Sequence, residues 1–264
     1  MTTNPPTTVS ANTLDSAKLY VPVICDSTKT LGNPNKRVLL MGDPGSGKST
    51  AMLTFPNLIV CEFDNQIQKF NDRDIPFIPF YDKDIIDKKF KTSVTCQALL
   101  KFIKDEASKF SGEQTLGIDS LTTLNNAVHG YYWAICPMSK KDPTEKDGFW
   151  FWDMVKDYYI ELHVALLKLK CRVVVCAHLG EDKDKDGRII GYKPLVEGSF
   201  KQMMGLYYTD VFKQLGREKQ SGVGNSTTIV SEYVWQIRSG GFVQCKTTIK
   251  TDKMYVPASY ESFL

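Results

Sequence analysis

The sequence predicts an α/β fold, in which a mostly parallel sheet is flanked by helices and continues into an antiparallel extension toward the C-terminus. Short apolar runs without polar alternation are typical of strands covered on both faces, and they occupy residues 37–41, 57–61, 115–118 and 171–176. Apolar residues at helical spacing lie between these runs, over residues 93–108 and 150–169. No low-complexity linker divides the chain after residue 30. We therefore predict a partly flexible N-terminal arm over residues 1–30 and one folded domain over residues 31–264.

Turn signals indicate how these elements connect. The first run ends in a glycine-rich turn, and the short helix that follows is expected to end before Pro56, because the position before a proline disfavours helical backbone. An Asp-Gly pair within residues 183–188 predicts a hairpin with a type I′ turn. From residue 227 onward, two β-rich segments meet around a Gly-Gly pair at 240–241, which predicts two antiparallel strands.

Composition excludes several classes of protein. The chain has 264 residues, of which 42% are hydrophobic and 24% charged, as in ordinary globular domains. No window approaches the ~20 uncharged apolar residues of a membrane-spanning helix, and the first residues lack the features of a secretory signal. Seven cysteines without a C-x-x-C pair indicate free thiols in a reducing compartment. We therefore expect a cytoplasmic protein with no membrane partner. A net charge of +3 does not by itself indicate nucleic-acid binding.

The strongest functional signal is a phosphate-binding loop directly after the first predicted strand. Its pattern, G-x-x-x-x-G-K-[ST], allows successive backbone N–H groups to face an anion, because glycine has no Cβ in the way. The lysine of this pattern reaches the β- and γ-phosphates, and the hydroxyl after it binds Mg²⁺. The matching residues are Gly42, Asp43, Pro44, Gly45, Ser46, Gly47, Lys48, Ser49 and Thr50. The sequence therefore predicts a site for a nucleoside triphosphate or diphosphate.

A second candidate is Asp119, which follows the apolar run at residues 115–118. Hydrolysis needs a carboxylate near the metal, and α/β sheets bind ligands at the carboxyl ends of their strands. We predict that Asp119 holds Mg²⁺ through water. The alternative is that Asp119 and Ser120 serve to cap the next helix, since both are good N-cap residues.

Three further polar residues follow predicted strands. Glu62 and Asp64 end the run at residues 57–61 and would point to the same side of an extended segment, so either could activate a water molecule. The alternative is a solvated turn. His178 follows the run at residues 171–176, where it could hydrogen-bond the γ-phosphate or the attacking water, or could be a satisfied core residue.

These segments resemble the RecA-like P-loop ATPases, and especially the small phage-encoded RecA-core proteins associated with single-strand annealing and recombination. The matching segments are MGDPGSGKST, NLIVCEFD, TLGIDSLTTL and RVVVCAHLG, which occur in the family's order and at similar spacing. After them, GYKPLVEG and YYTDVFKQLGR resemble the family's hairpin and the strand beyond it. The resemblance covers residues 36–260 and implies a RecA-like core.

The resemblance also implies roles for individual residues. Lys48 and Ser49 would bind phosphate and Mg²⁺, and Asp119 would be the Walker B carboxylate. Asp64 falls in the position of the catalytic base, where the family has a glutamate, and Glu62 stands just before it. This departure leaves open which of the two carboxylates acts.

The histidine and two loops complete the correspondence. His178 stands where RecA has a glutamine that senses the γ-phosphate. The DNA-contacting loops of the family would correspond to residues 134–147 and 180–200, although their charges are balanced. Several aromatic residues in or beside these loops are available for stacking on bases, namely Tyr131, Tyr132, Trp133, Phe149, Trp150 and Tyr192. The family hydrolyses ATP between subunits, and the candidate residues for completing a neighbour's site are Arg217, Arg238, Lys246 and Lys250.

Together these observations predict an Mg²⁺-dependent ATPase that binds single-stranded DNA in phage recombination, annealing or replication. The resemblance implies self-association into a ring or filament, in which the N-terminal arm contacts a neighbour, and other phage recombination proteins as partners. Three alternatives remain. A nucleotide kinase would need an arginine-rich lid, a regulatory module would bind ATP without hydrolysing it, and a DNA motor or packaging ATPase would share the same core.

Overall fold

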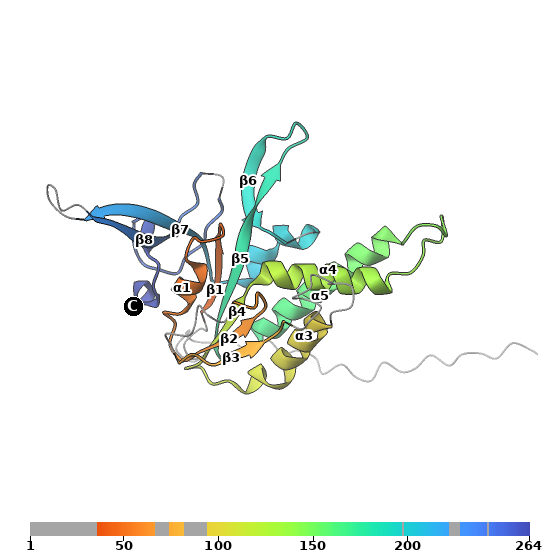
Figure 1. Ribbon diagram of the computed structural model, residues 1–264, viewed down its shortest axis with the longest axis horizontal. Coiled ribbons are helices and arrows are strands. Elements are labelled where there is room, and N and C mark those ends of the chain that lie inside the picture. The colour runs from red at the N-terminus through yellow and green to blue at the C-terminus, as the bar shows by residue number, and fades with distance from the viewer. Residues whose placement is uncertain (1–35, 67–73, 82–93, 197, 222–227, 242) are drawn as a thin grey trace, which may run out of the picture. The chain divides into compact units, whose positions relative to one another are not determined.

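The described part of the chain is built around one β-sheet, in which the order of the strands differs from their order in the sequence (Figure 1). The computed structural model describes residues 36–66, 74–81, 94–196, 198–221, 228–241 and 243–264. Its strands are β1 (Arg37–Gly42), β2 (Leu58–Glu62), β3 (Phe77–Pro79), β4 (Thr115–Asp119), β5 (Arg172–Lys183), β6 (Ile189–Pro194), β7 (Asp210–Ser221), β8 (Thr228–Gln236) and β9 (Tyr255–Pro257). The order across the sheet is β3-β2-β4-β5-β1-β7-β8-β9, and β6 pairs with β5 off this path.

The pairing directions confirm the predicted fold class. From β3 to β7 every neighbouring pair in the sheet order is parallel, whereas β8 and β9 continue the sheet in antiparallel fashion. The carboxyl ends of β1, β2, β4 and β5 therefore meet at one edge of the sheet. This edge is the place where an α/β sheet binds its ligand.

Four helices connect the strands within the described residues, together with short 3₁₀ turns. The helices are α1 (Lys48–Met52), α3 (Thr95–Asp105), α4 (Leu121–Ile135) and α5 (Gly148–Leu167), and the 3₁₀ turns are η2 (Ala107–Lys109), η3 (Ser199–Gln202), η4 (Met204–Tyr207) and η6 (Tyr260–Phe263). The sequence periodicity located α3 and α5 correctly, and α1 ends before Pro56 as predicted. The side chain of Asp147 caps α5 by accepting the backbone N–H groups of Phe149 and Trp150.

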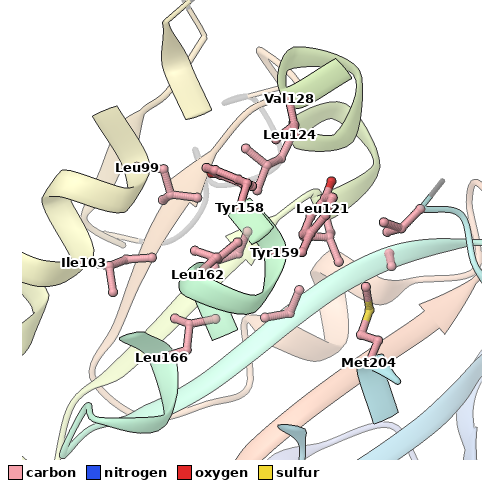
Figure 2. Packing of buried hydrophobic residues seen from close by; sticks show 14 of the residues in the cluster. Leu99, Ile103, Leu121, Leu124, Val128, Tyr158, Tyr159, Leu162, Leu166 and Met204 are labelled. Atoms are coloured by element: carbon pink, nitrogen blue, oxygen red, sulfur yellow. The ribbon is translucent and has the colours of Figure 1, made fainter. Parts of the chain in front are cut away.

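The two faces of the sheet bury different apolar clusters. Along β1 the side chains alternate, as a strand requires. Leu39 and Met41 belong to the large cluster that also includes residues of α3, α4 and α5, whereas Val38 and Leu40 belong to a smaller cluster with residues of α1 and the C-terminal part. Figure 2 shows Leu99 of α3 and side chains of α4 and α5 meeting in the large cluster. A continuous apolar run is thus explained by burial on both faces.

The β5–β6 hairpin corrects one detail of the sequence prediction. The hairpin lies where it was predicted, but β5 continues seven residues past the apolar run, to Lys183. Gly187 has a φ of 79°, while Asp186 does not have a positive φ, so the turn is not type I′. Instead, the Gly187 N–H donates to the Asp184 carbonyl at 3.1 Å, and the Asp184 carboxylate accepts the N–H groups of Asp186 and Arg188. One left-handed residue is sufficient here because the turn is longer than two residues.

The end of the chain corrects a second prediction. The segment after Gly241 does not form the partner strand of β8 in the described residues. One edge of β8 pairs with β7, and the end of its other edge, Val234–Gln236, pairs with β9 instead. Residues 243–250 contact other strands through isolated bridges, such as the one between Val211 and Lys246. The sequence pattern identified β-rich segments but could not identify their partners.

Other expectations concern the termini and the membrane. The predicted arm over residues 1–30 lies outside the described residues, so it stays a prediction. None of the described helices combines the length and apolar character that crossing a bilayer requires. The six described cysteines are free, and all except the half-buried Cys245 are buried.

Candidate nucleotide-binding site

The phosphate-loop residues connect β1 to α1 at the carboxyl edge of the parallel strands. Gly45 and Gly47 have φ angles of 76° and 86°, which glycine adopts without steric cost. The loop curves so that the Lys48 ammonium group donates hydrogen bonds of 2.8 Å to the carbonyl oxygens of both Gly42 and Asp43. The lysine therefore lies against the loop itself, where it can meet a phosphate bound there.

At two of the loop glycines, neighbouring atoms leave no room for a side chain. A Cβ on Gly42 would lie 2.5 Å from Ser46 Oγ and 2.7 Å from the carbonyl oxygen of Gln214. A Cβ on Gly47 would lie 2.4 Å from the ring of Tyr233. All three distances are shorter than a Cβ atom can approach another atom. The glycine pattern thus reflects tight packing against β7 and β8 as well as phosphate binding.

A hydrogen bond joins the two predicted metal-binding residues. Ser49 Oγ donates to Asp119 Oδ2 at 2.7 Å, and Asp119 is buried at the end of β4. The alternative role as helix cap belongs to Ser120, whose side chain accepts the N–H of Thr123 at the start of α4. Hydroxyl and carboxylate oxygens are the hard ligands that Mg²⁺ prefers. Ser49 and Asp119 therefore fit the ion, and no described cluster of three or more His, Cys, Asp or Glu side chains offers it a separate site.

The carboxylate of Glu62 is hydrogen-bonded to the backbone of the residues that follow it. Its side chain is fully buried, and its two carboxylate oxygens accept the backbone N–H groups of Asp64, Asn65 and Gln66 at 3.0 to 3.1 Å. These bonds hold the turn that follows β2. The geometry therefore gives Glu62 a structural task at the position where the sequence left two candidate bases.

Asp64 lies in a different environment. Its Oδ1 accepts a hydrogen bond from Ser120 Oγ at 3.3 Å and another from Thr123 Oγ1. Both hydroxyl groups come from the start of α4, directly after Asp119. The side chain of Asp64 lines the cavity at the phosphate loop, with its orientation fixed by these two donors.

His178 completes this side of the site. It is level with Gly42 in the ladder between β5 and β1, and its backbone N–H donates to Thr122 Oγ1 at 3.0 Å. Burial lowers the pKa of the half-buried ring, and the nearby charge of Lys48 lowers it further, against the opposing effect of nearby carboxylates such as Asp64. These effects favour the neutral imidazole, in which one ring nitrogen can donate a hydrogen bond and the other can accept one.

One cavity of about 390 Å³ brings most of the predicted residues together. Its lining includes Pro44, Gly45, Gly47, Lys48, Ser49, Thr50, Asp64, Asp119 and His178. Among the described residues that line it, Glu62 is not included, and neither are the loop residues Gly42, Asp43 and Ser46. The cavity has the polar lining and the size that a nucleotide requires.

The structure adds site residues that the sequence analysis missed. Leu53, Gln66 and Tyr233 line the cavity, and Thr122 and Thr123 hold His178 and Asp64. The two threonines follow Asp119 within one helical turn, so their spacing could have been noticed. Tyr233 is far away in sequence, and only the register of β8 places it here.

The two predicted DNA-contacting segments belong to different connections of the fold. Residues 136–147 join α4 to α5, and residues 180–200 contain the β5–β6 hairpin. Phe149 is 89% exposed and Trp133 is 38% exposed, whereas the other aromatic candidates are partly buried against the large cluster (Tyr131, Tyr132, Trp150 and Tyr192). Contact with DNA stays a prediction.

Three of the four candidate residues for a neighbour's site, Arg217, Arg238 and Lys246, have partners within the chain. The Arg217 guanidinium lies 4.0 Å from the centre of the Tyr255 ring, and Lys246 donates to the carbonyl oxygen of Tyr208 at 2.6 Å. Arg238 likewise donates to a backbone carbonyl. Their role between subunits stays a prediction.

Comparison with known proteins identifies the type of domain. A family model described as AAA domain matches residues 34–232 of the chain. The matched part runs from β1 into β8 and contains the phosphate loop, Asp64, Asp119 and His178. No curated protein matches the chain at a significant level.

Proposed function

The chain belongs to the AAA domain family of P-loop ATPases, and from this premise we propose that it binds ATP with Mg²⁺, hydrolyses it, and acts on single-stranded DNA in phage recombination, annealing or replication. One observation supports hydrolysis above all. Lys48, the hydrogen-bonded pair of Ser49 and Asp119, and Asp64 line the same cavity. These are the charge, the metal ligands and the base that phosphoryl transfer to water requires.

Lys48 and the loop amides act on the phosphates. The lysine ammonium is held by the carbonyl oxygens of Gly42 and Asp43, so it is already oriented before the nucleotide binds. A fixed positive charge stabilises the transferring phosphoryl group without reorganisation. When bound at Ser49 and Asp119, Mg²⁺ supplies further positive charge beside the phosphate oxygens.

Asp64 is the base in this proposal. Glu62 already accepts three backbone N–H groups and is fully buried, which makes it unsuited to receive a proton from water. Asp64 lines the cavity, and the two hydroxyl groups that hold Oδ1 leave its second oxygen to orient the attacking water. The aspartate would thus perform the task that the RecA-like proteins give to a glutamate.

His178 would link the nucleotide to the DNA-binding segments. Its ring lines the cavity, and its backbone N–H donates to Thr122 of α4. At its far end, α4 leads into residues 136–147, and β5 continues from His178 into the β5–β6 hairpin. A shift of the ring on contact with the γ-phosphate would therefore act on both segments, as in other switches driven by this phosphate.

Single-stranded DNA is the proposed partner for these segments. Phe149, which is 89% exposed, lies just after the first segment at the start of α5, and Lys146 Nζ lies 5.4 Å from the centre of the partly exposed Trp133 ring at the end of α4. Exposed aromatic rings beside lysines suit stacking on bases near a phosphate backbone. We further propose a ring or filament in the host cytoplasm, with a neighbour completing each ATP site and other phage recombination proteins as partners.

The test is steady-state ATPase activity with and without single-stranded DNA, using Lys48→Ala as the blank. We expect turnover that requires Lys48 and rises when single strands are added. Turnover that ignores DNA would point instead to a different motor, and phosphate transfer to a nucleoside monophosphate would identify a kinase. ATP binding without turnover would identify a regulatory module and would contradict the role of Asp64.

A further inference from the structure

The position of the phosphate loop in the strand order determines which side of β1 each end of a bound nucleotide faces. β1, which carries the loop, lies between β5 and β7. The residues proposed to act on the γ-phosphate all come from one side, because His178 lies within β5, Asp119 ends β4 and Asp64 follows β2. On the other side of β1 lie β7 and then β8. Neighbouring strands are about 4.8 Å apart, so these two sides are clearly separated across the sheet edge.

A bound nucleoside triphosphate must follow this direction. Its γ-phosphate has to reach Asp64 and His178 for hydrolysis, so its ribose and base extend away from them. The phosphate loop holds the chain of phosphates in between. The base therefore leaves the loop toward β7 and β8.

Tyr233 lies at this opposite end. It belongs to β8, lines the nucleotide cavity, and pairs across the ladder with Gly216 of β7. The ring passes over Gly216, where a Cβ would lie 3.5 Å from it, and reaches Gly47 of the phosphate loop. Because both neighbours are glycines, no side chain separates the ring from the loop. Tyr233 is half-buried, so part of its ring stays accessible beside the cavity.

We propose that Tyr233 is the platform on which the nucleobase stacks. The proposal rests on the proposed function and deepens it, because it assigns the base end of the same site. Aromatic rings stack on any base, so this contact favours nucleotides over inorganic polyphosphates without selecting one base. Leu53, at the end of α1, lines the same cavity and adds an apolar contact. The match to the AAA domain family ends at residue 232, so Tyr233 lies just outside it.

A purely structural role for Tyr233 makes a different prediction. If the ring served to support Gly47, its loss would deform the phosphate loop and weaken every ligand that the loop binds. If the ring stacks on the base, its loss lowers the affinity for ATP and leaves the affinity for a ligand without a base unchanged. Inorganic tripolyphosphate provides that comparison.

The experiment is calorimetric titration of the full chain with ATP and with tripolyphosphate, both in the presence of Mg²⁺. We expect Tyr233→Leu to lower the affinity for ATP about tenfold, which is the loss typical of one stacked base. The affinity for tripolyphosphate should not change. Tyr233→Phe should bind both ligands as the wild type does. The matched control is Tyr255→Leu, which removes a ring from β9 that does not line the described cavity. In turnover, Tyr233→Leu should raise KM and leave kcat unchanged.

Two results would overturn the assignment. Equal weakening of ATP and tripolyphosphate would make Tyr233 a support of the loop, and unchanged ATP affinity in Tyr233→Leu would place the base elsewhere. Failure of the proposed function is recognised separately. A wild-type chain that binds neither ligand would refute the nucleotide site as a whole, whereas one that binds ATP without hydrolysing it would refute the ATPase and leave the Tyr233 result valid.

Discussion

Ser49 Oγ donates a hydrogen bond of 2.7 Å to Asp119 Oδ2. The two residues are far apart in sequence, yet the start of α1, which follows β1, and the end of β4 bring them together at one edge of the sheet. A hydroxyl group and a carboxylate held at this distance are prepared to share a metal ion through direct and water-mediated contacts.

In Asp119→Asn, the ATPase rate should therefore require a higher concentration of Mg²⁺. The substitution keeps the size and the hydrogen bond to Ser49 but removes the negative charge, and loss of such a partner typically costs about 10- to 100-fold in metal affinity or activity. ATPase rates measured over a range of Mg²⁺ concentrations would show it. Asp105→Asn is the control, because Asp105 is exposed on α3 and pairs with Lys101. An unchanged Mg²⁺ dependence in Asp119→Asn would contradict the assignment.

Asp64→Asn and Glu62→Gln should fail in different ways. Asp64→Asn should lower kcat by about 10²- to 10⁴-fold while ATP still binds, because a general base is lost. Glu62→Gln removes the charge that accepts three backbone N–H groups, so it should lower the free energy of unfolding by about 1–3 kcal/mol. Single-turnover rates and urea unfolding of both variants separate the two roles. A catalytic loss in Glu62→Gln with normal stability would exchange the assignments.

Thr123 should orient Asp64 through its hydroxyl group. Thr123→Val keeps the shape of the side chain and removes this donor, which we expect to lower kcat about tenfold, the value of one hydrogen bond to a charged group. The affinity for ATP should not change. Thr123→Ser retains the hydroxyl and should restore the rate. If Thr123→Ser were as slow as Thr123→Val, the methyl group and its packing would be the cause.

Phe149 should contribute to binding of single strands. Its side chain is 89% exposed at the start of α5, and loss of one stacked base typically costs about tenfold in affinity. We expect Phe149→Ala to bind a labelled oligothymidine more weakly in fluorescence anisotropy. Leu206→Ala is the control, because Leu206 is 78% exposed in η4. Equal losses in both variants would argue against a specific contact.

The stability of the domain should fall on mild acidification because of His163. Burial lowers the pKa of this histidine from 6.5 to about 4, and its ring nitrogens contact the Tyr159 carbonyl and the Tyr208 hydroxyl. Between these pKa values the unfolded chain binds more protons than the folded one, so stability rises with pH through this window and is lost as pH falls from 6.5 toward about 4. The contribution is about 2 kcal/mol between pH 7 and pH 5.

Urea unfolding at pH 7 and pH 5 would measure this effect. His163→Gln cannot titrate, so its free energy of unfolding should change less between the two pH values than that of the wild type. Comparison of the two differences removes the contribution of the carboxylates, which both chains share. An equal pH dependence in both chains would show that another group is responsible.

Much of the fold could be predicted because burial leaves a local pattern. Strands such as β1 and β4, covered on both faces, read as continuous apolar runs, and the phosphate loop must place its glycines, lysine and hydroxyl within nine residues. The strand pairing of the C-terminal part could not be predicted in this way. The ladders of β8 depend on which strands reach its two edges, and β9 is a three-residue strand without a pattern of its own.

The sequence by itself determined that the chain is an α/β domain with a phosphate loop, since both properties reside in short contiguous segments. Only the tertiary structure distinguished the surroundings of Glu62 from those of Asp64, because two carboxylates of the same chemistry cannot be told apart by their local sequence. Glu62 is occupied by the turn after β2, whereas Asp64 meets the hydroxyl groups of α4. The place of Tyr233 likewise came from the register of β8 with β7, and side-chain partners across a sheet are set by register, which no single strand encodes.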